Sequence, residues 1–268
     1  MDATEIARLH HKHCRAEFGT TTPDELEYIQ SLIVKHRPKR VIEIGTASGV
    51  TTGFIAQFLS ENGGTSVTTI DLAETFFAEP TKPVGYLANQ IYSGSDVTIE
   101  MFTKKTSLDL ASLGGPWDMA FIDANHQHPW PTIDTLAVAP FLSGPRIVIH
   151  HDLQLYRRFR RFRGIGPRVL FNEMPDSHRH AVKANGWNIF SLDLTMPAST
   201  LEHVCVGALS MPWTATPPLG TRTLKNCTGF LGAHYSDEFV SEFEDCAALN
   251  KVSLPKRAML YLRAKIAR

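Results

Sequence analysis

The sequence has no excess of either charge and no long apolar run. Its 268 residues include 27 Lys plus Arg and 27 Asp plus Glu, so the formal net charge is zero. A neutral chain has no overall field to attract nucleic acid or an anionic membrane. No stretch reaches the length needed to cross a bilayer, and the first eight residues carry charges where a secretion signal has an apolar core. We therefore expect a cytoplasmic protein without a membrane or nucleic acid partner.

Cysteine is scarce and scattered. No two of the four cysteines form a C-x-x-C pair, and no dense disulfide framework is present; the positions are Cys14, Cys205, Cys227 and Cys246. This usage is typical of idle or buried thiols in a reducing compartment. At 43% apolar composition, a chain of this length can bury a full core. One α/β domain with extensions fits these numbers.

Two common phosphate-binding loops are missing. The apolar run Arg40 to Ile44 is followed by Gly45-Thr46-Ala47-Ser48-Gly49, which matches neither Gly-x-Gly-x-x-Gly nor the P-loop. A nicotinamide-dependent oxidoreductase is therefore the least favoured enzyme class. Glycine has no Cβ atom, so we expect Gly45 and Gly49 to let a nucleoside-like ligand approach the backbone at the end of a strand.

A second apolar run, Ser66 to Ile70, ends in Asp71, whose carboxylate can accept hydrogen bonds from a ribose diol. Glu43 to Gly49 followed by Asp71 resembles the S-adenosylmethionine (SAM) site of class I methyltransferases. The alternative is an ordinary strand-to-helix turn with a capping Asp. The resemblance implies SAM as cofactor, an adenine pocket lined by Ser107 and Leu108, and these cofactor-binding residues in all: Glu43, Gly45, Thr46, Ala47, Ser48, Gly49, Asp71, Ser107, Leu108 and Asp123.

Strand and helix patterns alternate through the middle of the chain. Apolar runs predict strands at 40–44, 66–70, 97–101, 117–123 and 146–152, separated by helical patterns or turns. Such alternation implies a parallel sheet with helices on both faces. Trp187 to Leu194 and His203 to Leu209 are close enough for an antiparallel pair. The expected fold is α/β, Rossmann-like and doubly wound, with a mostly parallel seven-stranded sheet, an antiparallel terminal hairpin and an appended helical C-terminal segment.

Three regions follow from this pattern. We expect N-terminal helices over 1–38 that pack on the core and cover the cofactor site, a SAM-binding domain over 39–211, and a helical extension over 212–268. The second N-terminal helix begins at a capping box in which Glu25 is the third helical residue. In the extension, amphipathic patterns near 235–249 and 255–267 predict helices. These form a packing or dimer element, with a substrate lid as the alternative.

Three acids follow separate predicted strands. Ligands of open α/β sheets bind outside the carboxyl ends of the strands, so Asp71, Asp123 and Asp152 should converge on one rim. A divalent cation held by Asp123 and Asp152 could bind a vicinal diol and lower the pKa of one hydroxyl. His126, three residues beyond Asp123, could then take the proton as the catalytic base.

This pattern resembles the metal-dependent O-methyltransferases, which include the catechol and macrolide-sugar enzymes. In that family an acid ends strand four, a base follows three residues later, and an acidic pair ends strand five. Here His151 occupies the first position of the pair, as in cephalosporin-hydroxylase-like relatives, and leaves His151-Asp152. The resemblance implies a hydroxylated small-molecule acceptor, a sugar or phenol, and a Mg²⁺ or Mn²⁺ ion on Asp123, His151 and Asp152.

Other interpretations stay open. His126 alone could serve as the base of a metal-independent SAM methyltransferase, or the chain could be a non-catalytic SAM-fold subunit that binds or assembles through its C-terminal helices. Asp123 and Asp152 could cap helices, and His126, His128, His150 and His151 could be hydrogen-bonded surface rings. The basic run 157–163 predicts a solvated helix face with Phe159 and Phe162 turned inward, or else a contact with an acidic or phosphorylated substrate.

Overall fold

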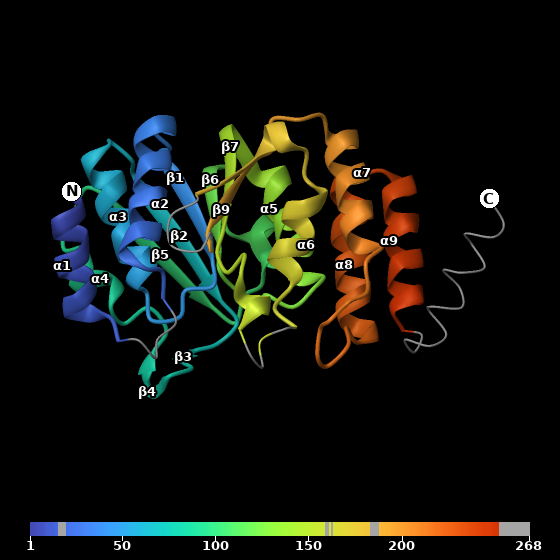
Figure 1. The fold of residues 1–268 in the computed structure, drawn as a ribbon, viewed down its shortest axis with the longest axis horizontal. Coiled ribbons are helices and arrows are strands. Elements are labelled where there is room, and N and C mark those ends of the chain that lie inside the picture. Colours follow the sequence, from blue (N-terminus) through green and yellow to red (C-terminus); the bar gives the residue numbers. More distant parts are fainter. Residues whose placement is uncertain (16–19, 159–160, 162, 183–187, 252–268) are drawn as a thin grey trace.

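A seven-stranded sheet with helices on both faces forms the centre of the computed structural model (Figure 1). The structure describes residues 1–15, 20–158, 161, 163–182 and 188–251. The strand order is β5-β2-β1-β6-β7-β9-β8. The strands are β1 (Arg40–Ile44), β2 (Ser66–Asp71), β5 (Thr98–Thr103), β6 (Trp117–Ile122), β7 (Leu142–His150), β8 (Arg179–Ala181) and β9 (Phe190–Asp193).

The first five of these strands are parallel, and β9 pairs antiparallel with both β7 and β8. From β1 the chain builds outward through β2 to β5, then returns to place β6 on the other side of β1. The direction of winding therefore reverses between β1 and β6. In open α/β sheets this switch point opens a crevice at the carboxyl ends of the strands, which is where ligands bind.

Residues of each central strand point alternately to two helical layers. Val41 of β1 packs in a cluster with α1 (Ala3–His13), α2 (Pro23–His36), α3 (Val50–Glu61) and α4 (Ala88–Ile91). Its neighbour Ile42 packs in the opposite cluster, whose helices are α5 (Trp130–Val138), α6 (Gly166–Glu173), α7 (Ala198–Leu209), α8 (Thr221–His234) and α9 (Asp237–Asn250). In Figure 1, α8 and α9 form an outer layer beyond α6. The predicted fold class is thus confirmed, including its helical C-terminal segment.

Short elements complete the fold. The hairpin β3 (Thr75–Phe76) and β4 (Glu79–Pro83) follows β2, in a region where the apolar runs predict no strand. The 3₁₀ helices are η2 (Ser107–Ser112), η3 (Ala139–Phe141), η4 (Leu155–Arg157) and η5 (Asp176–His178). In the basic run 157–163, Arg157 ends η4, and none of the other described residues, Arg158, Arg161 and Arg163, is helical; Phe159 and Phe162 lie outside the described residues.

The antiparallel pair contains one of the two predicted segments. β9 lies within the predicted strand Trp187 to Leu194, but its partner is β8, and the predicted strand His203 to Leu209 belongs to helix α7. The buried residues of α7 are Leu201, Val204, Cys205, Ala208 and Leu209, a spacing of one helix face that an apolar run obscures. Trp187, the first residue of the other predicted strand, lies outside the described residues.

The C-terminal region differs from its prediction in one helix. The pattern near 235–249 corresponds to α9, α8 was not predicted, and 255–267 lies outside the described residues. Leu231 of α8 and Phe243 of α9 are buried in the core cluster. All four cysteines are free thiols. Within the described ranges, no helix combines the length and apolar character that a bilayer crossing requires.

Candidate active site

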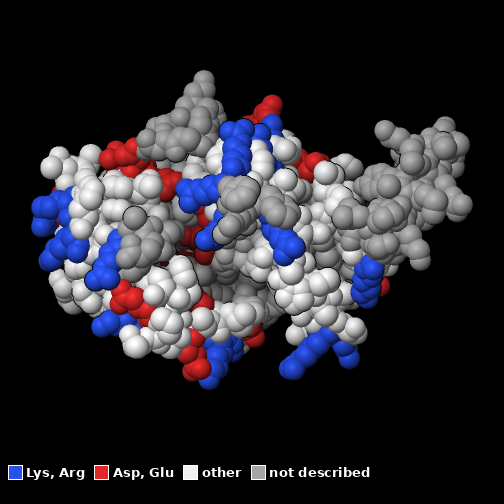
Figure 2. Space-filling model, turned by 60° about the horizontal axis from the view of Figure 1, so that its bottom comes forward, with Lys and Arg blue, Asp and Glu red and all other residues white. Residues whose placement is uncertain are grey.

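The carboxyl ends of β1, β2, β6 and β7 open into one cavity of about 1230 Å³. Figure 2 shows a hollow on this face, with acidic side chains inside it. The cavity brings together most of the residues singled out in the sequence, namely Gly45, Thr46, Ala47, Ser48, Asp71, Ser107, Asp123, His126, His151 and Asp152. The predicted convergence of Asp71, Asp123 and Asp152 on one rim therefore holds. Glu43, Gly49 and Leu108 are not among its lining residues.

The two loop glycines allow backbones to approach each other. Gly45 has a φ of 97°, and a Cβ atom there would lie 2.3 Å from the carbonyl oxygen of Asp123. Gly49 has a φ of 85°, and its Cβ atom would lie 2.7 Å from the Cα atom of Gly85. These distances are far below van der Waals contact. The sequence-based reason for the glycines, room for a ligand, was therefore wrong, because protein backbone fills the space beside each of them.

Asp71 fixes the shape of the loop. Its Oδ2 atom accepts hydrogen bonds from the backbone N–H groups of Thr46 and Ala47, both at 3.0 Å, and its Oδ1 atom accepts one from Ala73 at 2.8 Å. Ala47 adopts a left-handed φ of 48°, so its position depends on such external support. A carboxylate has about four lone-pair sites, so Asp71 can still accept hydrogen bonds from a ligand in the cavity.

Glu43 lies beneath the loop, away from the cavity. Its Oε2 atom accepts hydrogen bonds from the hydroxyls of Thr52 at 2.5 Å and Thr69 at 2.6 Å. Burial raises the pKa of Glu43 to about 8, so the carboxyl is protonated at neutral pH. Glu43 thus links β1 to α3 and β2, and the structure does not place it against a cofactor. Leu108 likewise packs against the hydrophobic core.

Ser107 lines the cavity together with an acid that sequence reasoning missed. Its hydroxyl donates to Oδ1 of Asp134 at 2.5 Å, and both side chains are buried. Burial raises the pKa of Asp134 to about 7. The signal was present in the sequence, because Asp134 is the one charged residue in the apolar helix α5. A lone acid on such a helix needs a polar partner or a ligand.

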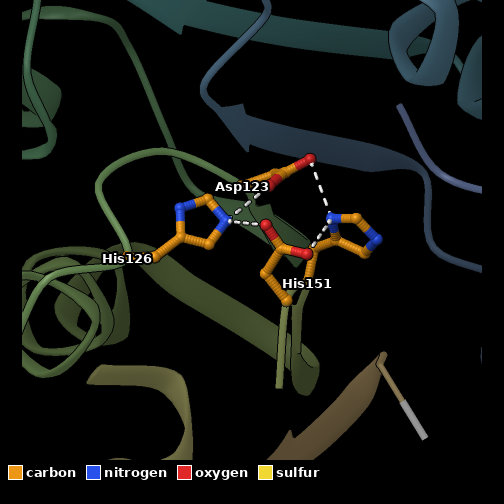
Figure 3. A group of neighbouring side chains, drawn as sticks. Asp123, His126 and His151 are labelled. Atoms are coloured by element: carbon orange, nitrogen blue, oxygen red, sulfur yellow. Dashed lines mark ion pairs between the residues drawn. The ribbon is translucent and has the colours of Figure 1, made fainter. Parts of the chain in front are cut away.

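Four side chains that follow β6 and β7 gather around one point, and Figure 3 labels three of them, Asp123, His126 and His151. The Nε2 atom of His126 lies 2.8 Å from Oδ2 of Asp152 and 3.1 Å from Oδ1 of Asp123. The Nδ1 atom of His151 lies 3.3 Å from Oδ2 of Asp123 and 3.7 Å from Oδ1 of Asp152. One ligand atom from each residue falls within 4.8 Å of the others. We call these four residues the Asp–His cluster.

The donor set of the Asp–His cluster fits a divalent cation. The Nε2 atom of His126 and the Nδ1 atom of His151 are buried, and neither makes an aligned hydrogen bond, although both face carboxylates. Carboxylate oxygens suit Mg²⁺ and Mn²⁺, and imidazole nitrogen extends the choice to later transition metals. Asp152 adopts a left-handed φ of 65°, a conformation that is costly outside glycine and concentrates at functional sites.

Opposite charges balance within this cluster. Burial by itself would lower the pKa of both rings, but the carboxylates outweigh it, raising the pKa of His126 to about 9 and that of His151 well above its usual value. Burial would raise the pKa of Asp123, and the two rings instead hold it far below its usual range. Two imidazolium rings thus neutralise two carboxylates. Binding of a cation requires the ligating rings to release protons.

Two residues beside the cluster were missed. The Oε2 atom of Glu25 lies 3.2 Å from Nε2 of His151, and the side-chain amide of Asn188 donates to Oδ1 of Asp152 at 2.9 Å. Glu25 also completes the predicted capping box with Thr22. Because the capping role explains Glu25 fully, nothing in the local sequence pointed to a second role.

The other two histidines of this region are buried away from the cluster and are not surface rings. The Nε2 atom of His150 lies 2.8 Å from the hydroxyl of Thr135, and its ring stacks on Phe190 at 5.0 Å. Burial lowers the pKa of His150 to about 3 and that of His128 to about 4. Both rings are therefore neutral at physiological pH and belong to the packing of the fold.

Comparisons with known proteins agree with this architecture. A family model described as a methyltransferase domain matches residues 42–153. No curated protein matches the sequence. Among solved structures, a putative caffeoyl-CoA O-methyltransferase from Staphylococcus aureus is similar with a TM-score of 0.52 at 16% identity, covering 71% of this chain and 98% of its own.

Two further solved structures have similar folds. The SAH-bound methyltransferase PaMTH1 from Podospora anserina has a TM-score of 0.51 at 16% identity and covers 72% of this chain and 88% of its own. The O-methyltransferase TomG from Streptomyces achromogenes, in complex with SAM, has a TM-score of 0.50 at 17% identity, with 71% and 88% covered. At these identities the likeness concerns the fold alone. Residues 42–153 match the model of a methyltransferase domain, and they lie in a chain whose fold is similar to those of the solved methyltransferases.

Proposed function

We propose that this protein transfers the methyl group of SAM to a hydroxyl of a small molecule, a sugar or a catechol-like phenol, with the help of a divalent metal ion. One observation carries the proposal: the Asp–His cluster lines the same cavity as Asp71 and the loop Gly45 to Ser48. Its volume of about 1230 Å³ exceeds the roughly 300–1,000 Å³ of most single-ligand pockets. An acceptor therefore has room beside the cofactor.

The loop side of the cavity is the proposed cofactor site. Gly45 to Ser48 and Asp71 would contact SAM, with Asp71 free to accept hydrogen bonds from a ribose diol. Ser107 and Asp134, which also line the cavity, supply a polar pair for the adenine base of SAM. His10, His11, Cys14 and Arg15 also line the cavity, which supports a covering role for the N-terminal helices. SAM brings a methyl group that is already activated on its sulfonium.

The metal side of the cavity is the proposed acceptor site. Asp123, His151 and Asp152 would hold Mg²⁺ or Mn²⁺, and Glu25 and Asn188 orient two of these ligands. A bound divalent ion lowers the pKa of a coordinated hydroxyl. The carboxylates of Asp123 and Asp152 stabilise the protonated ring of His126 and so raise its pKa. A metal ion bound to these carboxylates would weaken that stabilisation and lower the pKa of His126 again. The ring then becomes neutral and can accept the hydroxyl proton.

The C-terminal helices serve as packing elements in this proposal. No described residue of 212–251 lines the cavity, whereas Leu224, Leu231, Phe239 and Phe243 are buried in the core cluster. This placement disfavours the substrate lid for the described part of the extension. A contact between two copies of the chain through the outer faces of α8 and α9 stays compatible with it.

Methyl transfer to a panel of catechols and sugars, followed by mass spectrometry, tests the proposal. We expect product with SAM, loss of product after exhaustive chelation, and recovery with Mg²⁺ or Mn²⁺. His126→Gln should abolish turnover, whereas His203→Gln, at an exposed ring on α7, should leave it unchanged. Turnover that survives chelation would favour His126 as the base of a metal-independent enzyme. Normal affinity for S-adenosylhomocysteine (SAH) without any transfer would favour a non-catalytic subunit.

A further inference from the structure

The segment after Asp152 crosses the rim of the cavity as a series of turns. The N–H groups of Leu155, Arg158, Arg161 and Gly164 each donate to the carbonyl oxygen three residues earlier, at 2.8–3.1 Å. The N–H group of Gly166 then donates to the carbonyl oxygen of His126 at 2.9 Å. The segment therefore leaves one member of the Asp–His cluster and returns to the backbone of another.

Packing fixes this segment against the body of the protein. Leu155 is buried, and a Cβ atom on Gly164 would lie 2.7 Å from its Cδ2 atom, so the two residues are in close contact. The hydroxyl of Thr214, in the linker before α8, donates to the carbonyl oxygen of Arg163 at 2.7 Å. The backbone that carries Arg158 and Arg161 is thus held at both ends.

Two guanidinium groups of this segment line the cavity without a partner. Arg158 and Arg161 are exposed lining residues, and neither pairs with an acid within the described part of the chain. Two other cations nearby are engaged, since Arg157 donates to the hydroxyl of Tyr156 and Lys104 pairs with Glu74, whereas Lys105 lines the cavity after β5. Figure 2 shows basic side chains gathered along one edge of the hollow and acidic ones within it.

The charges that line the cavity differ in exposure. The carboxylate of Glu25 is buried and those of Asp123 and Asp152 are half-buried, whereas Arg158 and Arg161 are exposed. A molecule with a neutral hydroxyl at one end and an anionic group at the other fits this arrangement. The hydroxyl can face the Asp–His cluster, and the guanidinium groups can bind carboxylate or phosphate oxygens through paired hydrogen bonds.

We propose that the acceptor carries a carboxylate or phosphate group, which Arg158 and Arg161 bind while a hydroxyl of the same molecule faces the Asp–His cluster. This inference rests on the proposed function and adds the chemical class of the acceptor. It assigns the basic run a role in recognition and gives it no part in the chemical step.

Matched pairs of ligands that differ in one anionic group test the proposal. SAH-loaded protein is titrated in Mg²⁺ buffer with 3,4-dihydroxybenzoate and its methyl ester, and with glucose 6-phosphate and glucose. We expect one anionic member to bind about tenfold more tightly than its neutral partner, and the pair that shows this tells carboxylate from phosphate. Arg158→Ala, Arg161→Ala and the double variant should remove this preference. Arg157→Ala is the matched control, because Arg157 is exposed in the same run but does not line the cavity.

Each other outcome contradicts the inference. Equal affinity within both pairs overturns it, including no detectable binding of any member, as does a preference that survives in the double variant. Loss of SAH affinity in the arginine variants would assign these groups to the cofactor instead. A separate result tests the proposed function. Methylation of a neutral diol without any preference for anions supports the proposed function and contradicts this inference, whereas binding of anions without methyl transfer to any acceptor contradicts the proposed function.

Discussion

The carboxylate of Glu25 lies 3.2 Å from the imidazole of His151, although 126 residues separate them in the chain. Glu25 stands in the first turn of α2, and His151 directly follows β7. The contact joins the N-terminal helices to the Asp–His cluster. A carboxylate on the far nitrogen of a metal-binding histidine fixes the ring orientation and raises its basicity as a ligand.

Glu25→Gln should weaken metal binding without weakening cofactor binding. Loss of the charge beside His151 lowers the basicity of the ring, and outer-shell partners of this kind contribute about 10–100-fold in metal affinity. Calorimetric titration with Mn²⁺ measures the metal affinity, and titration with SAH measures the cofactor affinity. Glu27→Gln, an exposed change on the same helix, is the control. Unchanged Mn²⁺ affinity in Glu25→Gln would contradict the assignment.

Asp71→Ala should lower the affinity for SAH by about tenfold or more. The substitution removes the acceptor that holds the N–H groups of Thr46 and Ala47, and it removes the proposed acceptor for the ribose. Asp71→Asn keeps one oxygen for the loop, so we expect a smaller loss. Asp176→Ala, at an acid outside the cavity, should bind SAH normally. Wild-type affinity in Asp71→Ala would place the cofactor elsewhere.

Gly45→Ala should destabilise the protein far more than a matched change at another left-handed glycine. The new Cβ atom would lie 2.3 Å from the carbonyl oxygen of Asp123, so the ends of β1 and β6 must separate. We expect a cost of about 3 kcal/mol or more, the sum of backbone strain and overpacking. Gly114 has a similar φ of 81°, and a Cβ atom there would have no neighbouring atom within 4 Å. Gly114→Ala should therefore cost only about 1–2 kcal/mol of stability. Equal losses in chemical denaturation would refute the close approach.

Glu43→Gln should change how stability depends on pH. The folded-state pKa of about 8 exceeds the value of 4.5 for the unfolded chain, so between these limits the folded protein retains a proton that the unfolded chain has released. This contribution to stability is present in full below pH 4.5 and falls by about 1.4 kcal/mol per unit as the pH rises toward 8. The glutamine variant lacks this titration and should gain stability relative to the wild type across that window. Melting temperatures of the two proteins that change with pH in the same way from pH 5 to 8 would contradict this prediction.

The strand ends were predictable because both the apolar runs and the acids that end them are local signals. Asp123 and Asp152 could be placed on one rim from the rule that parallel strands share a carboxyl edge. Helix α7 was not recovered, because a short apolar run suits a strand as well as a buried helix face. Tertiary contacts decided the rest: Glu25 reaches His151 across the fold, Gly45 faces a neighbouring strand, and Glu43 turns away from the cavity.

A crystal structure with SAH and Mn²⁺ tests the central claim most directly, since Mn²⁺ is visible by its anomalous scattering. The account predicts one ion among Asp123, His151 and Asp152, with metal–oxygen distances of about 2.1 Å, and SAH in the same cavity with its ribose at Asp71. Anomalous density elsewhere, or SAH bound outside the cavity with the Asp–His cluster free of metal, would contradict it.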